Sequence, residues 1–396
     1  MTPREAFVAQ STAKPLAEVI KEAAAIAAQH ADDVDRQSRF PIEAITALKA
    51  GRALSAYVPR ELGGAGVSLD DLCAASFELS RRCSATGMVF AMHQIQVGTI
   101  VRHWNGAGWF TGYLEELVRD QRLIASATSE VGTGGDLRAS IAPVEMLEGG
   151  RARFEKKAPT CSYGAHSDDL LTSLRRTPDS DHGDQVGVLT RASETEMQPV
   201  SVWDTLGMRG TCSPGFVVRA EFAAEQILPK SFSVMAAETM VPWSHILWAH
   251  VWMGIATDAF DRAQAFVRSQ ARQTPGITPP SATRLSELSA ELAKLRGLVR
   301  VAADEYNRIA DEPGRETLST MGYAVRINNL KIASSEASSE ICQKALRICG
   351  VSGYRNGTQY SVGRHLRDSL SAALMIANER IHATNATLLL VHREAR

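Results

Sequence analysis

The feature that most constrains the fold of this 396-residue chain is the order of its sequence patterns: helical patterns occur at both ends, and strand patterns fill the middle. A doubly wound parallel sheet needs strands and helices that alternate throughout, so this order excludes one. A Gly-x-Gly-x-x-Gly dinucleotide motif after a first strand is also absent. We therefore expect an α+β multidomain chain with an N-terminal helical domain (residues 1–122), a middle antiparallel β-barrel or β-sandwich domain (123–230) and a C-terminal four-helix bundle (231–396).

Simple periodicities support each of these three parts. Near the start of the chain, apolar residues at three- and four-residue steps predict a helix with one buried face; they are Leu16, Val19, Ile20, Ala23 and Ala27. In the middle, short apolar runs between clusters of Gly, Asp, Pro and Ser predict strands separated by turns; they cover residues 170–174, 186–190 and 216–222. Towards the end, leucines at helical spacing predict a helix over residues 286–309, and the Ala- and Ser-rich residues 321–346 predict another.

Composition narrows the class of protein and of partner. The formal net charge is −1, which gives no reason to expect nucleic acid or an anionic membrane as a partner. The six cysteines form no C-x-x-C pair, which indicates reduced thiols rather than a disulfide framework or a metal site. The apolar residues 241–259 are interrupted by polar ones and fit a buried helix better than a membrane span. Because the first residues also lack the pattern of a signal peptide, we expect a cytoplasmic protein.

Four short segments point to one family when they are taken together and in order. They are residues 57–66 (Y-V-P-R-E-L-G-G-A-G), 126–136 (S-A-T-S-E-V-G-T-G-G-D), 206–213 (L-G-M-R-G-T-C-S) and 348–354 (I-C-G-V-S-G-Y). They resemble the P-x-x-x-G-G-x-G, T-E-P-x-x-G-S-D, G-M-R-x-S/T-x-S and G-G-x-G-Y/F segments of the acyl-CoA dehydrogenase superfamily, and the last is followed by Arg367-Asp368. The resemblance covers most of the chain. It implies an acyl-CoA dehydrogenase-like fold and a flavin-dependent oxidoreductase.

The resemblance also implies which residues contact the flavin ring. In the family, hydroxyl and backbone groups of the second motif hold the ring, and Thr128 and Ser129 sit at the matching positions here. Gly135 would let the backbone approach the cofactor closely. Thr160 and Ser162 occupy the zone where the family has a Trp and a Thr over the flavin. Because the Trp is missing here, the ring must be shielded differently.

A second set of residues concerns the cofactor's phosphates and the assembly. Gly350 and Gly353 occur where the family lets a loop meet the FAD pyrophosphate of a neighbouring subunit, because exposed N–H groups can hold phosphate. This implies FAD as cofactor and a homodimer or homotetramer. FMN is the alternative cofactor, because Gln270 takes the position of a family arginine and the aromatic-Gly pair that normally follows is absent. Arg268 and Arg272 are the candidates to substitute for that arginine.

The chain departs from the family at the catalytic base. An acyl-CoA dehydrogenase needs a carboxylate to remove the α proton of its substrate. The usual position of this glutamate matches Ile376, and the position used by a minority of members matches Ser244. Glu379 lies one helical turn beyond Ile376 and His245 is adjacent to Ser244, so these two residues are the candidate bases.

Three functions remain open at this point. The first is α,β-dehydrogenation of an acyl thioester, carried on CoA or on a carrier protein, with another flavoprotein as possible electron acceptor. The second is a flavin-dependent monooxygenase on the same fold, which uses reduced flavin and oxygen and does not need the glutamate. The third is a non-catalytic homologue.

Overall fold

The N-terminal part of the molecule is helical, as the sequence predicts. The structure is a computed structural model that describes residues 14–134 and 136–391, so the residues on which the signal-peptide prediction rests lie outside it. The helices of this part are α1 (Leu16–Gln37), α2 (Ile42–Ala50), α3 (Leu69–Arg82), α4 (Ser84–His103) and α5 (Trp109–Asp120). The predicted apolar face of α1 is buried. At the start of α3, the Ser68 side chain and Asp71 form a capping box, which fixes how the preceding loop enters the helix.

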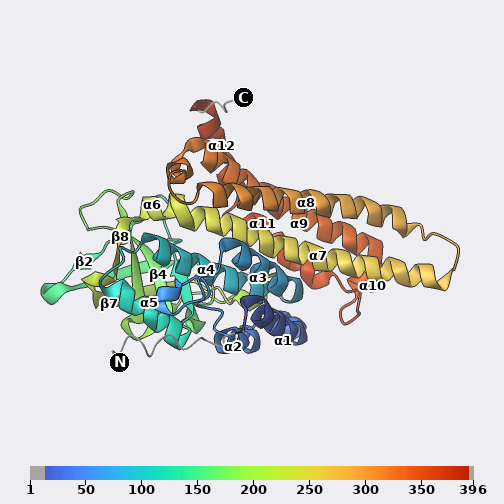
Figure 1. The fold of residues 1–396 in the computed structure, drawn as a ribbon, viewed down its shortest axis with the longest axis horizontal. Coiled ribbons are helices and arrows are strands. Elements are labelled where there is room, and N and C mark those ends of the chain that lie inside the picture. The colour runs from blue at the N-terminus through green and yellow to red at the C-terminus, as the bar shows by residue number, and fades with distance from the viewer. Residues whose placement is uncertain (1–13, 135, 392–396) are drawn as a thin grey trace.

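The middle part folds into two β-sheets that form a sandwich rather than a closed barrel. In the described residues, one sheet has the strand order β1-β4-β5-β8 and the other has the order β2-β3-β7-β6. The strands are β1 (Ile124–Ala127), β2 (Glu145–Met146), β3 (Arg151–Ala158), β4 (Asp169–Arg175), β5 (Gln185–Arg191), β6 (Thr195–Pro199), β7 (Phe216–Ala223) and β8 (Ile227–Ser231). The apolar runs that predict strands lie in β4, β5 and β7, so those predictions are confirmed. Figure 1 shows the sheets at one end of the molecule, beside α5.

One pair of strands differs from the antiparallel arrangement that the sequence predicts. β1 pairs with β4 in parallel, with Ile124 opposite Asp169, whereas the other strand pairs of the described residues are antiparallel. The reason is that β2 and β3 belong to the other sheet. The chain therefore leaves the first sheet after β1 and re-enters it in the same direction, which a succession of hairpins would not do.

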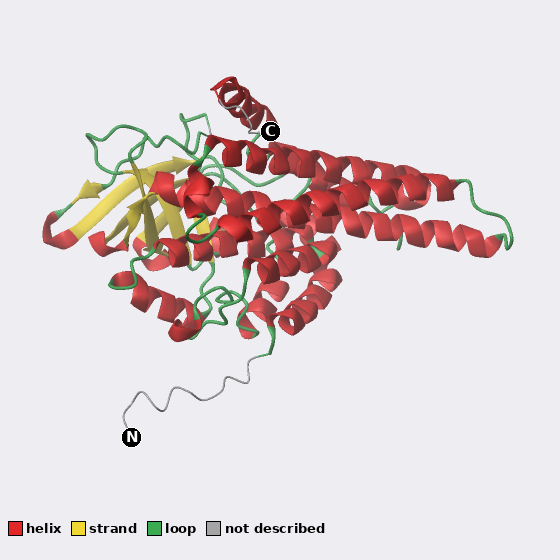
Figure 2. Cartoon of the chain, turned by 45° about the horizontal axis from the view of Figure 1, so that its top comes forward, coloured by secondary structure: helices red, strands yellow, loops and turns green. Residues whose placement is uncertain are grey.

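The C-terminal part is built from long helices. They are α6 (Phe232–Met235), α7 (Val241–Gln273), α8 (Ser281–Ile309), α9 (Met321–Cys349), α10 (Val351–Tyr354), α11 (Gly363–Leu374) and α12 (Asn378–Val391). Helix α9 packs against α7, α8 and α11, which confirms the four-helix bundle. Figures 1 and 2 show α7, α8 and α9 side by side and extending away from the sheets, while α12 projects from the bundle.

One continuous hydrophobic core joins the three parts. Within it, α4 crosses α7 so closely that a Cβ atom on Gly98 would lie 2.3 Å from the Trp243 ring. A larger residue at this position would push the two helices apart, so Gly98 fixes the place of the first turn of α7. Within the described ranges, none of the helices has a stretch long and apolar enough to cross a membrane.

Candidate flavin site

The loop that follows β1 is braced by the buried carboxylate of Glu130. This carboxylate accepts hydrogen bonds from Ser140 Oγ (2.7 Å) and from the backbone N–H groups of Ile141 (3.0 Å) and Ala142 (2.7 Å). The Nζ atom of Lys156, which is itself buried, lies 3.7 Å from the same carboxylate. Burial lowers the pKa of Lys156 to about 8, and the Glu130 charge opposes that shift. The brace holds the loop that carries Thr128 in one place.

The structure brings together the described residues that sequence reasoning placed at the flavin ring. Ser129 Oγ donates to the carbonyl oxygen of Thr160 (3.1 Å), and Ser162 Oγ accepts from Ser213 Oγ (2.9 Å). The hydroxyls of Thr128 and Thr160 make no hydrogen bond to the described part of the chain, so both are available to a ligand. Gly135, the remaining residue of this set, lies outside the described residues.

Lys331 of α9 lies beside the turn between α11 and α12. It is fully buried, and its Nζ donates to the carbonyl oxygen of Ile376 (2.8 Å) and to Oδ1 of Asn378 (2.6 Å). The Trp252 ring lies 5.8 Å from the same atom. No carboxylate of the described residues forms an ion pair with this ammonium, and burial lowers its pKa to about 8. The Lys331 ammonium therefore lies next to Ile376, which occupies the position of the family's catalytic glutamate.

The backbone at Ile376 helps to explain this contact. Its φ angle is 50°, in the left-handed region that β-branched residues rarely adopt. The turn directs the Ile376 carbonyl at Lys331, and Asn378 ties the start of α12 to Ser335 of α9 through a further hydrogen bond of 3.1 Å. The hydrogen bonds from α9 offset the cost of the strained backbone.

The two candidate bases are both close enough to Lys331 to interact with it electrostatically. His245 of α7 is buried, and its Nδ1 has no hydrogen-bond partner in the described residues. Burial lowers the pKa of His245 to about 3, and the charge of Lys331 adds to that effect. Glu379 is exposed on the first turn of α12, and its charge raises the pKa of Lys331. Neither residue is a buried, ionised carboxylate.

The start of α12 lies near the braced loop. The pKa of Asp136 is lowered chiefly by its hydrogen bonds with Arg138, and the charge of Arg380 contributes as well. The start of α12 is therefore within electrostatic range of Asp136, although the two lie more than 200 residues apart in the sequence. Sequence reasoning missed Lys331, but a signal was present: it falls on the buried face of α9 with Ile327, Leu330, Ser334, Ser335 and Ser338.

Gly350 and Gly353 lie just beyond the C-terminal end of α9, away from Lys331. Gly350 has φ 56° and is exposed, whereas a Cβ atom on Gly353 would lie 2.5 Å from Cys349. Lys331 and Gly350 stand 19 residues apart along one helix and its cap, or about 28 Å at the rise of an α-helix. Within one chain, Gly350 therefore lies far from Lys331 along α9.

Family models match both helical parts of the chain. The acyl-CoA dehydrogenase N-terminal domain matches residues 12–107, and the acyl-CoA dehydrogenase C-terminal domain matches residues 235–382. The chain belongs to the acyl-CoA dehydrogenase superfamily. This membership confirms the fold that the four motifs imply, and it makes the protein a member of a flavoenzyme family.

Relatives within the superfamily catalyse different reactions. The chain is 24% identical over 326 residues to dibenzothiophene monooxygenase of Mycolicibacterium goodii, which covers 77% of each protein. It is 23% identical over 348 residues to mitochondrial isovaleryl-CoA dehydrogenase of Solanum tuberosum, which covers 86% of this chain and 81% of the relative. The fold also matches the solved structure of TdsC from Paenibacillus sp. A11-2 with FMN and indole, with a TM-score of 0.83, 20% identity, and coverage of 96% and 97% of the two chains.

The residues of the site fit a flavin ring better than they fit the phosphates of FAD. Two unoccupied hydroxyls on a braced loop suit hydrogen bonding to a planar ring, as the superfamily requires. At the position of the family's phosphate-binding arginine, Gln270 instead accepts a hydrogen bond of 2.7 Å from Ser281 at the start of α8. Arg268 and Arg272 nearby are exposed and form no ion pair within the described residues.

Proposed function

We propose that this protein is a flavin-dependent monooxygenase rather than a dehydrogenase of acyl thioesters. The observation that carries this proposal is the replacement of the carboxylate base. Ile376 and Ser244 occupy the two positions from which superfamily members supply it, and the buried charge beside Ile376 is the ammonium of Lys331. A carboxylate accepts the α proton of a thioester, whereas an ammonium can only donate one.

A bound reduced flavin would supply the chemistry of oxygen activation, in which one atom of O₂ enters the substrate and the other leaves as water. The chain's own groups hold and orient the reactants. Thr128 and Thr160 would donate hydrogen bonds to the ring. Lys331 Nζ holds a proton at neutral pH in a site closed to water, because its pKa is about 8 and its side chain is fully buried. Such a proton is available to an oxygen atom that gains negative charge.

The surroundings of Lys331 suit a substrate or co-substrate with acceptor atoms. The indole N–H groups of Trp248 and Trp252, on the same helix as His245, are buried and have no acceptor in the described residues. Buried donors are nearly always satisfied in folded proteins, so ligand atoms or water would complete them. The likeness to dibenzothiophene monooxygenase supports a small apolar or sulfur-containing substrate.

We further propose FMN as the cofactor. The neutral side chain of Gln270, which accepts a hydrogen bond from Ser281, stands at the position of the family's phosphate-binding arginine, which weakens the case for FAD. The likeness to the FMN-bound TdsC structure supports the same choice. Thermal release of the cofactor followed by mass determination distinguishes the two flavins directly.

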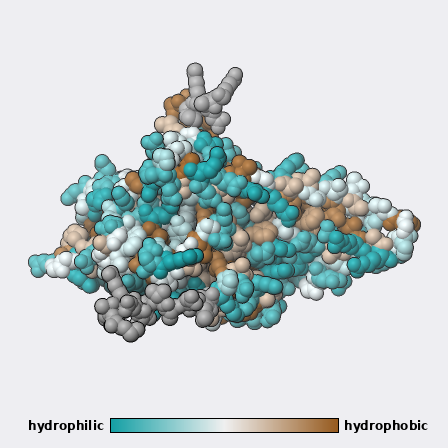
Figure 3. Space-filling model, viewed as in Figure 1, coloured by the Kyte–Doolittle hydropathy of each residue, from teal (hydrophilic) through white to brown (hydrophobic). Residues whose placement is uncertain are grey.

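The domain boundaries at residues 122/123 and 230/231 and the homo-oligomeric state also stay proposals. Figure 3 shows hydrophobic surface on the α12 projection, where Leu389, Leu390 and Val391 are exposed. A projecting helix with apolar residues on its surface is typical of a contact between copies of a chain. Cytoplasmic location likewise stays a prediction.

The experiment that tests the proposed function compares two reactions of the same flavin-loaded protein. We expect no bleaching of the flavin absorbance when short- and branched-chain acyl-CoA thioesters are added without oxygen. We expect oxygen uptake above the background when a separate reductase supplies reduced FMN together with dibenzothiophene or indole. Anaerobic bleaching by any acyl-CoA would restore dehydrogenation as the better proposal.

A further inference from the structure

A cleft with a volume of about 520 Å³ opens between the loop of the first motif and the C-terminal bundle. It is lined by residues from the 57–69 segment, the last turn of α4, the first turn of α7 and the end of α8. Pockets of this volume bind small molecules in many proteins. None of the residues placed at the flavin ring or beside Lys331 lines this cleft, so the proposed monooxygenase function does not account for it.

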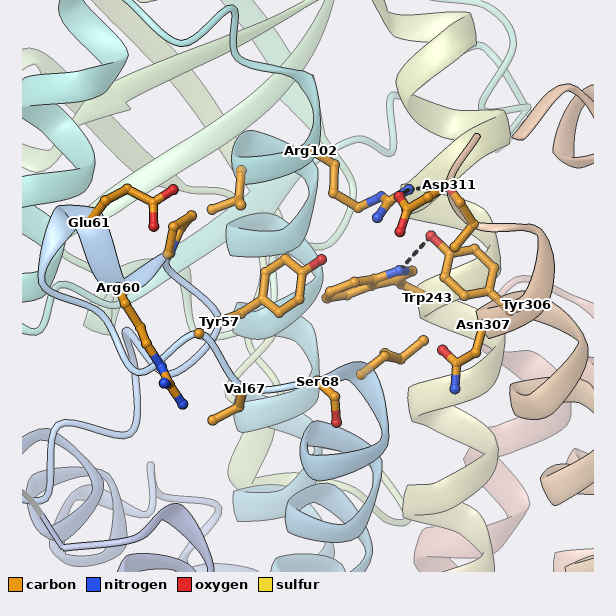
Figure 4. A pocket seen from close by; sticks show the side chains of 15 residues that line it. Tyr57, Arg60, Glu61, Val67, Ser68, Arg102, Trp243, Tyr306, Asn307 and Asp311 are labelled. Atoms are coloured by element: carbon orange, nitrogen blue, oxygen red, sulfur yellow. Dashed lines mark hydrogen bonds and ion pairs between the residues drawn. The ribbon is translucent and has the colours of Figure 1, made fainter. Parts of the chain in front are cut away.

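The floor of the cleft is aromatic and held in one geometry. The Tyr57 ring meets the Trp243 ring edge to face, with centroids 4.7 Å apart. Trp243 Nε1 donates to Tyr306 Oη (2.8 Å), and Tyr306 Oη donates to the carbonyl oxygen of Glu238 (3.1 Å). Figure 4 shows the three rings in a row across the cleft. Tyr57 is half-buried, so it offers the cleft an apolar surface that is already ordered.

Arg102 supplies the charge at the rim of this floor. Its side chain is only 10% exposed, and its guanidinium lies 6.0 Å from the centre of the Tyr306 ring. Its Nε is buried and has no hydrogen-bond partner in the described residues. Its NH2 group contacts the carbonyl oxygen of Ala310 and the carboxylate of Asp311 (3.2 Å). Figure 4 shows Arg102 and Asp311 facing each other at one side of the cleft.

The Asp311 carboxylate is a weak partner for this arginine. Its side chain is 81% exposed, and it makes a single contact rather than the two parallel hydrogen bonds that Arg and a carboxylate prefer. Exposed ion pairs of this kind contribute little free energy, so a ligand that binds with two oxygens can displace it. The unsatisfied Nε and the NH2 group are the two donors that such a ligand would use.

We propose that this cleft binds a small planar aromatic anion, with its acidic group on Arg102 and its ring against Tyr57. The ring gains apolar contact with Val67 and Val101, which are half-buried on the walls of the cleft. The anion replaces Asp311 as the counter-ion of Arg102. A cationic ligand is disfavoured because the guanidinium already occupies the space over the Tyr306 ring.

The proposal is tested by calorimetric titration of the flavin-loaded protein with benzoate and with benzamide, its neutral analogue. We expect benzoate to bind more tightly than benzamide, because only benzoate can pair with the guanidinium. Asp311→Asn removes the competing carboxylate from an exposed position, and we expect it to tighten benzoate binding several-fold. Arg102→Met should weaken benzoate binding about tenfold or more, which corresponds to the loss of a charged hydrogen bond.

Two controls establish whether benzoate occupies the cleft itself. Arg308→Met removes an exposed arginine of the same helix end that only contacts the Asp304 carbonyl, and it should leave benzoate binding unchanged. The flavin spectrum should also stay unchanged on addition of benzoate, because the proposed site is separate from the flavin. Equal binding of benzoate and benzamide would overturn the proposal, as would weaker binding in Asp311→Asn or no binding in both wild type and Asp311→Asn. A change of sedimentation in Asp311→Asn without benzoate binding would identify the cleft as a contact between copies of the chain and overturn it too.

Discussion

Two buried lysines, one in the middle domain and one in the helical bundle, show how differently the same side chain can be used. Lys156 and Lys331 are both 0–1% exposed, and burial lowers the pKa of each to about 8. Lys156 has the Glu130 carboxylate 3.7 Å away, so its charge is compensated inside the protein. Lys331 makes its hydrogen bonds to neutral groups, the carbonyl of Ile376 and the amide of Asn378, while the charges of Glu379 and Glu336 act on it without forming an ion pair.

This difference indicates a structural role for Lys156 and a functional role for Lys331. A compensated pair can hold a loop in place without influencing a ligand strongly. A buried charge without an ion-pair partner costs free energy, and groups with a perturbed pKa cluster at functional sites. We therefore propose that Lys156 holds the flavin loop in position and that Lys331 takes part in the chemistry of the site.

The largest expected effect concerns Lys156, and its absence would contradict this comparison of the two lysines. Lys156→Met leaves the Glu130 carboxylate buried without its cation and leaves the carbonyl of Ser173 without a donor. We expect the free energy of unfolding to fall by about 3 kcal/mol, as when one member of a buried pair is removed. Urea denaturation measures this. The adjacent Lys157→Met, on the exposed side of β3, is the matched control and should change stability by less than about 0.5 kcal/mol.

A smaller stability effect, with a larger functional one, is expected at Lys331. Lys331→Met removes a costly charge but takes the Lys331 donor from the Ile376 carbonyl and leaves Asn378 Oδ1 with only the longer hydrogen bond from Ser335 Oγ (3.4 Å), so we expect a net loss of about 1.5 kcal/mol in the free energy of unfolding. Product formation with reduced flavin and oxygen should fall at least about tenfold if Lys331 supplies a proton. Lys344→Met, on the same helix with a side chain 44% exposed, is the control. If Lys331→Met forms product at the wild-type rate, Lys331 has only a structural role.

The pH dependence of stability gives a finer test of the buried Lys331 charge. The pKa of Lys331 is lowered from 10.5 to about 8 in the folded chain, so the unfolded chain binds more protons between these values. The cost of burying the charge is fully present below pH 8 and disappears as pH rises towards 10.5. Wild type should therefore gain about 1 kcal/mol relative to Lys331→Met between pH 8 and pH 9. Parallel urea denaturations of the two proteins measure the gain, and a constant difference would show that the ammonium stays charged throughout.

The smallest effect is expected on the flavin side of the comparison. Thr160→Val removes a hydroxyl that has no partner in the described residues and nearly keeps the side-chain volume. We expect flavin affinity to fall by about 0.5–1.5 kcal/mol, which is the net contribution of one hydrogen bond. Fluorescence titration with FMN measures the affinity. Thr205→Val, whose hydroxyl donates within its own turn to Gly207, is the control.

Local patterns make the fold predictable, but only part of the site. The apolar runs of β4, β5 and β7 and the cap at Ser68 depend on neighbours in sequence, so the sequence alone predicts them. The parallel β1–β4 pair and the Lys331–Ile376 contact depend on segments far apart in the chain, and no local pattern encodes them. Residues 57–66 resemble a family turn, yet the cleft that they line needs α4, α7 and α8 to form. Thr128 and Thr160 are an intermediate case. The order of the family motifs predicts that these two residues lie close together, and their contact with the flavin stays a prediction.

The central claim is that this chain transfers oxygen rather than removing hydrogen from a thioester. The measurement that tests it most directly is mass spectrometry of the product formed from dibenzothiophene or indole, with reduced FMN supplied by a separate reductase under isotopically labelled O₂. The account predicts a product that carries one labelled oxygen atom per transfer and that depends on Lys331. A product without label, or an enoyl thioester formed from an acyl-CoA in the absence of oxygen, would contradict it.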